Sequence, residues 1–316
     1  MKIKIGITMG DPAGIGAEII KKALVSGRLP TRYIDILVIG DRWVFERIKN
    51  LKLKIKNFQF LDLKNTPKKN FRFGRISPSY GKASLEYIDR AIELIREKKI
   101  QVLVTCPVSK EAINLGGIDF KGHTEYLASH FGVEDFVMML VGGSLRVSLV
   151  TRHIPLNRVS SILNTSDIYK TILLTEKALR EFFGIKNPKI AVSSLNPHAG
   201  EGSFLGDEEK EKIVPAISLA KKHIKNVCGP YPIDTVFYSH FKRDYDCVVC
   251  MYHDQGLIPL KILFREKGVN ITLGLPFLRT SPLHGTAFDI AGKNKASPLS
   301  LIEAIRLAYR CSIKKD

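Results

Sequence analysis

The chain lacks any long apolar segment. No stretch approaches the roughly 20 apolar residues that a membrane-spanning helix requires. The start, residues 1–8 (MKIKIGIT), is too short and too alternating for a secretory signal and is interpreted as a first strand. These absences lead us to expect a cytoplasmic protein with no membrane partner.

Cysteine is scarce and odd in number. Five cysteines in 316 residues argue against the disulfide framework of small secreted proteins. Cys247 and Cys250 form a CxxC pattern, but they lie in an apolar stretch that is typical of a buried strand. Residues three apart on a strand point to opposite faces. We therefore interpret this pair as core cysteines, not as a zinc or redox site.

Nucleic-acid-binding motifs are also missing, although the formal net charge is +18. The lysines are scattered, and no zinc-finger, RNA-recognition or homeodomain pattern occurs. A basic surface that attracts anionic substrates explains the charge without a nucleic-acid partner.

The glycine-rich stretch GDPAGIG at 10–16 matches neither GxGxxG nor the phosphate-binding GxxxxGK[ST] motif. Glycines there allow close approach of a ligand, and the following helix would present free N–H groups to an anion. A tight turn without a ligand is an equally good interpretation of this stretch alone.

Strand-like and helix-like segments alternate, which predicts an α/β fold with a mixed, largely parallel sheet. The length favours two lobes, and the absence of a composition break suggests that the chain leaves one lobe and returns to it. Strands are predicted at 3–8, 34–39, 101–105, 189–195 and 246–252, a hairpin at 136–141 and 145–151, and helices at 17–25, 83–98, 167–183, 207–223 and 298–311.

Three histidines, His153, His198 and His253, stand in loop-like stretches crowded with polar residues. Imidazole is a common ligand of divalent metals, and catalytic sites typically use three protein ligands with one open position. A single loop histidine is more often a surface residue. The stretches NPHAGE (196–201) and MYHDQG (251–256) adjoin strand ends, where α/β sites form, which favours His198 and His253 over His153.

Three further stretches are rich in polar side chains. GHTE at 122–125 opens a short helix, so Thr124 is either a site residue or an ordinary cap. Lys261, Asn270 and Arg279 suit a phosphate-like anion, with surface ion pairs as the alternative. In HGTAFDIAG (284–292), the Asp289 carboxylate could accept from ribose hydroxyls.

Together, these motifs resemble the 4-hydroxythreonine-4-phosphate dehydrogenase family of pyridoxal phosphate biosynthesis. The resemblance runs from GDPAGIG through GHTE, NPHAGE, MYHDQG and GVNITLGLPFLRTS (268–281) to HGTAFDIAG. The two ends also look like isopropylmalate and isocitrate dehydrogenases. Ala17 stands where the family usually has proline. This difference does not weaken the resemblance, because proline at a first helical turn favours the helix start and supplies no chemical group.

The resemblance implies an isopropylmalate-dehydrogenase-like fold of two α/β/α lobes with a cleft between them. Residues 1–120 and 270–316 would form a lobe with much of the NAD site, and 121–269 a lobe with the metal ligands and the dimer interface. It implies a homodimer whose metal ligands, two from one subunit and one from its partner, are His153, His198 and His253. The substrate residues would be His123, Thr124, Lys261, Asn270 and Arg279, the catalytic candidates Lys261 and Asp234, and the cofactor residues His284, Gly285 and Asp289.

The implied reaction is oxidation of 4-phosphooxy-L-threonine at C3 by NAD, or else NADP, followed by decarboxylation to 3-amino-2-oxopropyl phosphate. Zinc, cobalt or magnesium would each suit the metal site. The alternatives within the family are 4-phospho-D-threonate and 4-phosphoerythronate dehydrogenases. A metal-dependent hydrolase is a further alternative, but it would leave the HGTAFDIAG stretch without a function.

Overall fold

The computed structural model describes residues 2–49, 58–241 and 244–314. The chain divides into two compact units, one containing the residues up to Glu134 together with Leu275–Ile313, and the other Asp135–Gly274 with Lys314. The chain leaves the first unit after Glu134 and returns to it at Leu275, later than the boundaries near 120 and 270 expected from the sequence. The helix at 123–130 belongs to the first unit because Arg96 donates to the carbonyl of His130 (2.6 Å).

The first unit is built on a parallel sheet with strand order β3-β2-β1-β4-β11. Its strands are nearly continuous apolar runs, as expected when helices cover both faces of a sheet. The strands are β1 (Ile3–Thr8), β2 (Ile34–Gly40), β3 (Phe58–Asp62), β4 (Val102–Thr105) and β11 (Leu278–Pro282). The helices are α1 (Gly16–Val25), α2 (Arg42–Glu46), α3 (Pro78–Arg96), α4 (Lys110–Leu115), α5 (His123–His130) and α11 (Leu299–Ser312).

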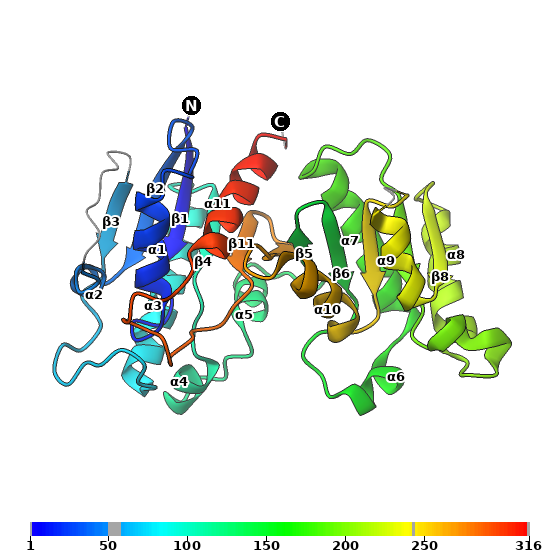
Figure 1. Ribbon diagram of the computed structural model, residues 1–316, viewed down its shortest axis with the longest axis horizontal. Helices are drawn as coiled ribbons and strands as arrows, with labels where there is room; N and C mark the ends of the chain where they lie inside the picture. Colours follow the sequence, from blue (N-terminus) through cyan, green and yellow to red (C-terminus); the bar gives the residue numbers. More distant parts are fainter. Residues whose placement is uncertain (1, 50–57, 242–243, 315–316) are drawn as a thin grey trace. The chain divides into compact units, whose positions relative to one another are not determined.

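Helices lie on both faces of this sheet. α11 packs on β4 and β11 and contacts α1, whereas α3 packs on β1, β2 and β4. Figure 1 shows α1 and α11 in front of these strands. α3 begins earlier than the predicted start at 83, because Pro78 suits a first helical turn and Tyr80 adds another buried side chain.

The second unit has strand order β10-β5-β6-β9-β7-β8. β5 is antiparallel to both of its neighbours, β10 and β6, whereas β6, β9, β7 and β8 run parallel to one another. The strands are β5 (Val137–Gly142), β6 (Leu145–Leu149), β7 (Ile190–Ser193), β8 (Val227–Tyr231), β9 (Cys247–Cys250) and β10 (Val269–Leu273). The α-helices are α6 (Val159–Ile162), α7 (Thr165–Glu181), α8 (Val214–Lys221), α9 (Ile233–Phe241) and α10 (His253–Phe264), with short turns at Leu156–Arg158, Pro197–Ser203 and Glu209–Ile213.

Several sequence predictions for the second unit are confirmed. β5 and β6 form the predicted hairpin, with Gly143 at φ 56° in the turn. Cys247 and Cys250 are fully buried, unbridged residues of β9. The helix predicted at 207–223 is confirmed at 208–221, except that its first part, Glu209–Ile213, is a π-helical turn ahead of α8. Within the described residues, no helix is both long and apolar enough to cross a bilayer.

A buried polar cluster lies at the carboxyl ends of β1 and β2 in the first unit. The Asp41 carboxylate accepts from Tyr87 Oη (2.6 Å) and from Thr66 Oγ1 (2.6 Å). Asp11 Oδ1 accepts from the N–H of Ala13 (2.8 Å), but Asp11 Oδ2 is buried with no hydrogen-bond partner among the described residues. Burial raises the pKa of Asp11 from 3.8 to about 7, against the opposing effect of the Ala13 N–H.

This shift predicts how stability depends on pH. Between pH 4 and pH 7 the unfolded chain ionises Asp11 while the folded chain keeps it protonated, so stability falls as pH rises. The Asp11→Asn variant should lose this dependence. Relative to the wild type, its free energy of unfolding should rise between pH 4 and pH 8 by at most on the order of 4 kcal/mol. Urea unfolding of both proteins across this range measures the difference.

The control is Asp35→Asn, which removes a half-exposed carboxylate paired with Lys2 on the same unit. This variant should keep the fall in stability with rising pH that Asp11 gives the wild type. A constant difference between Asp11→Asn and the wild type at every pH would contradict the proposed ionisation of Asp11.

Candidate active site

The three candidate metal ligands follow three adjacent parallel strands of the second unit. His153 comes after β6, His253 after β9 and His198 after β7, and the strand order is β6-β9-β7. The carboxyl ends of parallel strands meet at one edge of a sheet, which is where α/β proteins place their ligands. The topology therefore brings all three loops to the same edge of this unit.

His153 and His253 lie close together. The pairing of β6 with β9 continues past the strands, since Val150 N donates to Cys250 O (2.9 Å) and Thr151 N to Met251 O (3.1 Å). These bonds place the two following loops side by side. The centroids of the two imidazole rings are 5.7 Å apart, which is compatible with both rings binding one cation at about 2.0–2.1 Å from nitrogen.

The hydrogen bonding of His253 suits a metal ligand. Its Nδ1 lies 2.7 Å from Asp254 Oδ1, and an ionised carboxylate can only accept, so Nδ1 carries a proton, which in the neutral imidazole leaves the lone pair on Nε2. A cavity of about 240 Å³ adjoins the pair. It is lined by Arg152, His153, Ile154, Leu156, Val159, Tyr252, His253 and Asp254. The donor set of this pair therefore fits a divalent cation.

His198 does not join the other two histidines in this chain. In the part of the chain that the structure describes, no group of three or more His, Cys, Asp or Glu side chains gathers so as to hold a metal. His198 is exposed and begins a run of positive φ values that extends to Ser203. Such left-handed backbone is costly for residues other than glycine, so its surroundings must hold it in place.

Glu209 anchors this left-handed loop. Its side chain is buried, and Oε1 accepts from the N–H groups of Leu195 and Asn196 (both 2.8 Å). The Asn196 amide donates in turn to Oε2 of Glu209 (2.9 Å) and to Oε2 of Glu208 (2.7 Å). These bonds fix the chain just before His198.

Gln255 joins the loops that carry His198 and His253. It is buried, and its Oε1 accepts from Met251 N (2.8 Å) and from Ser193 Oγ (3.2 Å). Its Nε2 donates to Ser194 O (2.9 Å). One side chain at the start of α10 therefore sets the spacing between the ends of β7 and β9.

Three other candidates also belong to the second unit. Lys261 is exposed on α10, and Asp234 is exposed in the first turn of α9. Asn270 is buried in β10, and its Oδ1 has no hydrogen-bond partner among the described residues. Such an orphaned acceptor is unusual for a buried amide and is consistent with a bound donor.

In the first unit, the cations Arg279 and Lys110 both act on His123, and these three residues are called the cationic cluster. Arg279 is buried in β11, and both its Nε (3.2 Å) and its Nη2 (2.6 Å) donate to Thr105 Oγ1 at the end of β4. Burial lowers the pKa of Arg279 to about 10, although the charge of Glu125 opposes the shift. The guanidinium is still positive at neutral pH and can bind an anion.

His123, the third member of this cluster, lies at the start of α5. Its Nε2 is buried without a hydrogen-bond partner among the described residues. Burial lowers the pKa of His123 well below its usual value, and the positive charges of Arg279 and Lys110 lower it further. The imidazole is neutral at physiological pH. Thr124 is also buried, but the N-cap of α5 is Gly122, so its interpretation as a cap is wrong.

The glycine-rich loop and the HGTAFDIAG loop are in direct contact within the first unit. Ile15 N donates to Thr286 O (3.0 Å). Gly10 adopts φ 73°, and a Cβ there would lie 2.3 Å from Pro107 O, so only glycine fits. The loops after β1, β4 and β11 therefore form one layer at the carboxyl edge of the sheet.

The three candidate cofactor residues lie in this layer. His284 Nδ1 is 3.1 Å from the carbonyl oxygen of Gly285, which can only accept, and burial lowers the pKa of His284. Gly285 is exposed, and a Cβ there would meet no atom within 4 Å. Asp289 is exposed on the same loop.

Sequence reasoning missed Gln255, Glu209 and Thr105. Gln255 is part of the polar MYHDQG stretch, but its tie to β7 depends on the sheet order. Glu209 lies in the charged run at 207–212, which is typical of a solvated helix face. Thr105 ends a predicted strand, yet nothing local indicates that Arg279 reaches it.

Comparisons with known proteins identify the family of the chain. The chain is 45% identical to a 4-hydroxythreonine-4-phosphate dehydrogenase of Desulforapulum autotrophicum, covering 96% of this chain and 94% of that protein. It is 43% identical to a D-threonate 4-phosphate dehydrogenase of Cupriavidus necator, covering 96% and 95%. A crystal structure of 4-hydroxythreonine-4-phosphate dehydrogenase from Klebsiella pneumoniae is 38% identical, with a TM-score of 0.88 and coverage of 100% and 99%.

More distant structures share only the fold. Isocitrate dehydrogenase from Methylococcus capsulatus is 15% identical, with a TM-score of 0.53 over 99% of this chain and 86% of that one. This confirms the expected dehydrogenase-like α/β fold. Residues 32–308 match the family described as "Pyridoxal phosphate biosynthetic protein PdxA", and the chain belongs to that family.

Proposed function

We propose that the chain is an NAD-dependent dehydrogenase that oxidises 4-phosphooxy-L-threonine at C3 to 2-amino-3-oxo-4-phosphooxybutanoate. This β-keto acid then loses CO2 to give 3-amino-2-oxopropyl phosphate in pyridoxal phosphate biosynthesis. The observation that carries the proposal is similarity over nearly the full length to dehydrogenases named for this substrate. NADP is the alternative cofactor.

The cationic cluster of the first unit would bind the substrate. Arg279 offers a planar pair of donors suited to phosphate or carboxylate, and the neutral His123 can donate one hydrogen bond without adding charge. Thr124 lies next to His123 in the first unit. Lys261 and Asn270 of the second unit are proposed as further substrate residues, a cation and an amide. This set matches a small substrate with two anionic groups and a hydroxyl.

His153, His198 and His253 would hold a divalent zinc, cobalt or magnesium ion, which when bound lowers the pKa of the substrate hydroxyl and polarises the carbonyl that forms. Asp254 keeps His253 in the tautomer that a metal requires. Lys261 and Asp234 are the side chains proposed to accept the hydroxyl proton, directly or through water.

The loop at 284–292 would bind the cofactor beside the glycine-rich loop. His284, Gly285 and Asp289 are its proposed contacts. The exposed Asp289 carboxylate can accept from ribose hydroxyls and would repel a 2′-phosphate, which favours NAD over NADP. Gly285 has room for a ligand to approach its backbone.

A homodimer would complete the metal site. His153 and His253 are paired within one chain, so the third ligand would be His198 of a second copy. α10 begins at His253 and carries Ile258 and Ile262, which are 56% and 75% exposed and one turn apart. Exposed apolar side chains on a helix that starts at a metal ligand are consistent with a subunit interface next to the site.

A second candidate function is 4-phospho-D-threonate dehydrogenation, favoured by the 43% identity to the enzyme of Cupriavidus necator. The purified protein should reduce NAD+ with 4-phosphooxy-L-threonine at a higher kcat/KM than with 4-phospho-D-threonate or 4-phosphoerythronate. NADH absorbance measures all three reactions. A preference for the D-threonate substrate would establish the second candidate, and no NADH with any of them would reject both.

Mixing variants tests the shared metal site. His198→Ala and His253→Ala should each be inactive and bind little metal, yet after co-refolding the mixture should regain about one quarter of the wild-type sites. Each mixed dimer then contains one site with all three histidines. Metal content and NADH formation are both measured.

The control mixture combines His153→Ala with His253→Ala. Because these ligands come from the same chain, no mixed dimer has an intact site, and this mixture should stay inactive. Recovery in the control, or no recovery in the first mixture, would contradict the assignment of His198 to the second copy.

Replacement of Arg279 tests the anion-binding role. Arg279→Ala should raise the KM for the phosphorylated substrate at least about tenfold, because charge-assisted hydrogen bonds are lost. The KM for NAD+ should stay within about twofold, since the two ligands use separate contacts. Arg279→Lys keeps the charge and should be intermediate. A fall in kcat with an unchanged substrate KM would argue against this role.

A further inference from the structure

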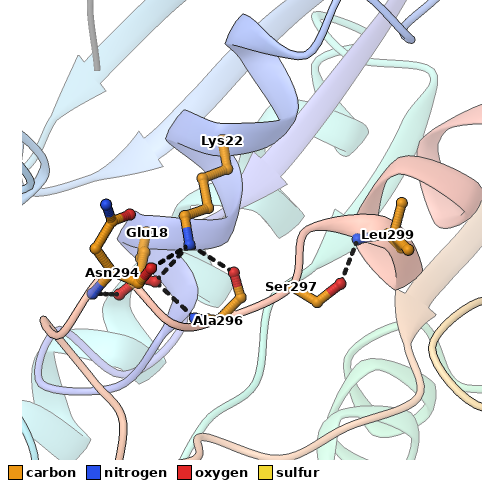
Figure 2. A network of polar contacts seen from close by, with 6 residues as sticks. All are labelled: Glu18, Lys22, Asn294, Ala296, Ser297 and Leu299. Atoms are coloured by element: carbon orange, nitrogen blue, oxygen red, sulfur yellow. Dashed lines mark hydrogen bonds and ion pairs between the residues drawn. The ribbon is translucent and has the colours of Figure 1, made fainter. Parts of the chain in front are cut away.

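The HGTAFDIAG loop leads into a buried charged network on α1 (Figure 2). Glu18 is 1% exposed, and its Oε1 accepts from Ala296 N (2.8 Å) while its Oε2 accepts from Asn294 N (3.3 Å). Burying a carboxylate costs free energy unless its oxygens accept hydrogen bonds. Here it bonds the backbone of the segment that directly follows the loop.

Lys22 completes the network from the next turn of α1. Its Nζ donates to Glu18 Oε1 (3.0 Å), Asn294 O (3.0 Å) and Ala296 O (2.8 Å). All three protons of the ammonium group therefore have an acceptor. Figure 2 shows the Lys22 and Glu18 side chains converging on the backbone of Asn294 and Ala296. The segment is thus bound through both its N–H and its C=O groups.

This network fixes the far end of the loop. At the near end, Leu283 N donates to Ser300 Oγ (2.9 Å), and the middle is joined to the glycine-rich loop by Ile15 N and Thr286 O. The stretch between these points consists of turns with no helix or strand to hold it. Besides its own turn hydrogen bonds, from Ile290 N to Ala287 O and from Lys293 N to Ile290 O, the side chains that hold its two ends fix its shape.

We propose that Glu18 and Lys22 form a positioning pair that sets the geometry of the cofactor-binding loop and so controls affinity for the nicotinamide dinucleotide. The inference rests on the proposed function, because it assigns the cofactor to this loop. The polar atoms of both side chains are engaged with each other and with the backbone of Asn294 and Ala296, so neither residue is proposed to contact the cofactor. They act through the backbone of Asn294 and Ala296, and their loss leaves the residues proposed to bind the substrate intact.

The charge of Glu18 is essential to this role. The two carboxylate oxygens accept from two different backbone N–H groups, and one also accepts from the ammonium of Lys22. Glutamine has the same shape but replaces one acceptor with an NH2 group, which would face a backbone donor. Lys22→Met keeps an unbranched apolar chain of nearly the same length, with sulfur in place of one methylene, and removes the ammonium group, so it serves as a second variant.

The experiment compares full-length wild type, Glu18→Gln and Lys22→Met. In both variants, deuterium exchange of the peptide covering residues 293–298 should be faster, and trypsin should cut after Lys293 or Lys295 more readily. The Kd for NAD+, measured by calorimetry, and the KM for NAD+ should both rise about tenfold. The substrate KM should stay within about twofold, because its contacts lie elsewhere.

The matched control is Glu303→Gln, which breaks another ion pair of the first unit, Glu303–Arg306 on α11, away from this segment. It should leave both loop exchange and NAD+ affinity unchanged. Unaltered exchange at 293–298, or wild-type NAD+ affinity in both variants, would overturn the inference alone. A wild type that binds neither NAD+ nor NADP+ would overturn the proposed function, and the inference with it.

Discussion

The candidate metal site depends on one constraint, the parallel direction of β6, β9 and β7. Because these neighbouring strands run the same way, the loops that carry His153, His253 and His198 all leave from one edge of the sheet. Reversing any of these strands would send its histidine to the opposite edge. The antiparallel hairpin of β5 and β6 allows this direction, since it returns the chain for a parallel pairing of β6 with β9.

Loops at such an edge leave some backbone groups without partners inside the loop, and in this protein buried acidic side chains satisfy them in both units. Glu209 accepts from the backbone ahead of His198, and Glu18 accepts from the backbone beyond the HGTAFDIAG loop. Asp41 accepts in the same way from Thr66 N (3.0 Å). Hydrogen bonds to a charged acceptor are stronger than neutral ones, so these irregular segments hold a defined shape without a helix or strand.

Sequence patterns predicted part of the regular structure of this fold, but not β3, β8, β10 or β11. β1 and α1 follow from local periodicity, and the hairpin follows from two glycines between apolar runs. α10 was missed because Pro259 interrupts its helical pattern. The left-handed run after Asn196 was missed because it has no periodicity at all and is specified by the distant Glu209. Local patterns cannot report contacts of that kind.

For the candidate site too, local sequence identifies residues but not the contacts between them. The residue types and the family resemblance singled out His153, His198 and His253, and the flanking stretches favoured His198 and His253 over His153. Only the strand order explains why the rings of His153 and His253 lie together. The most direct test is a crystal structure of the metal-loaded protein with anomalous data at the metal's absorption edge. We expect a peak between the rings of His153 and His253, with His198 of a second copy as the third protein ligand. A peak at any other position, or three histidine ligands from a single chain, would contradict it.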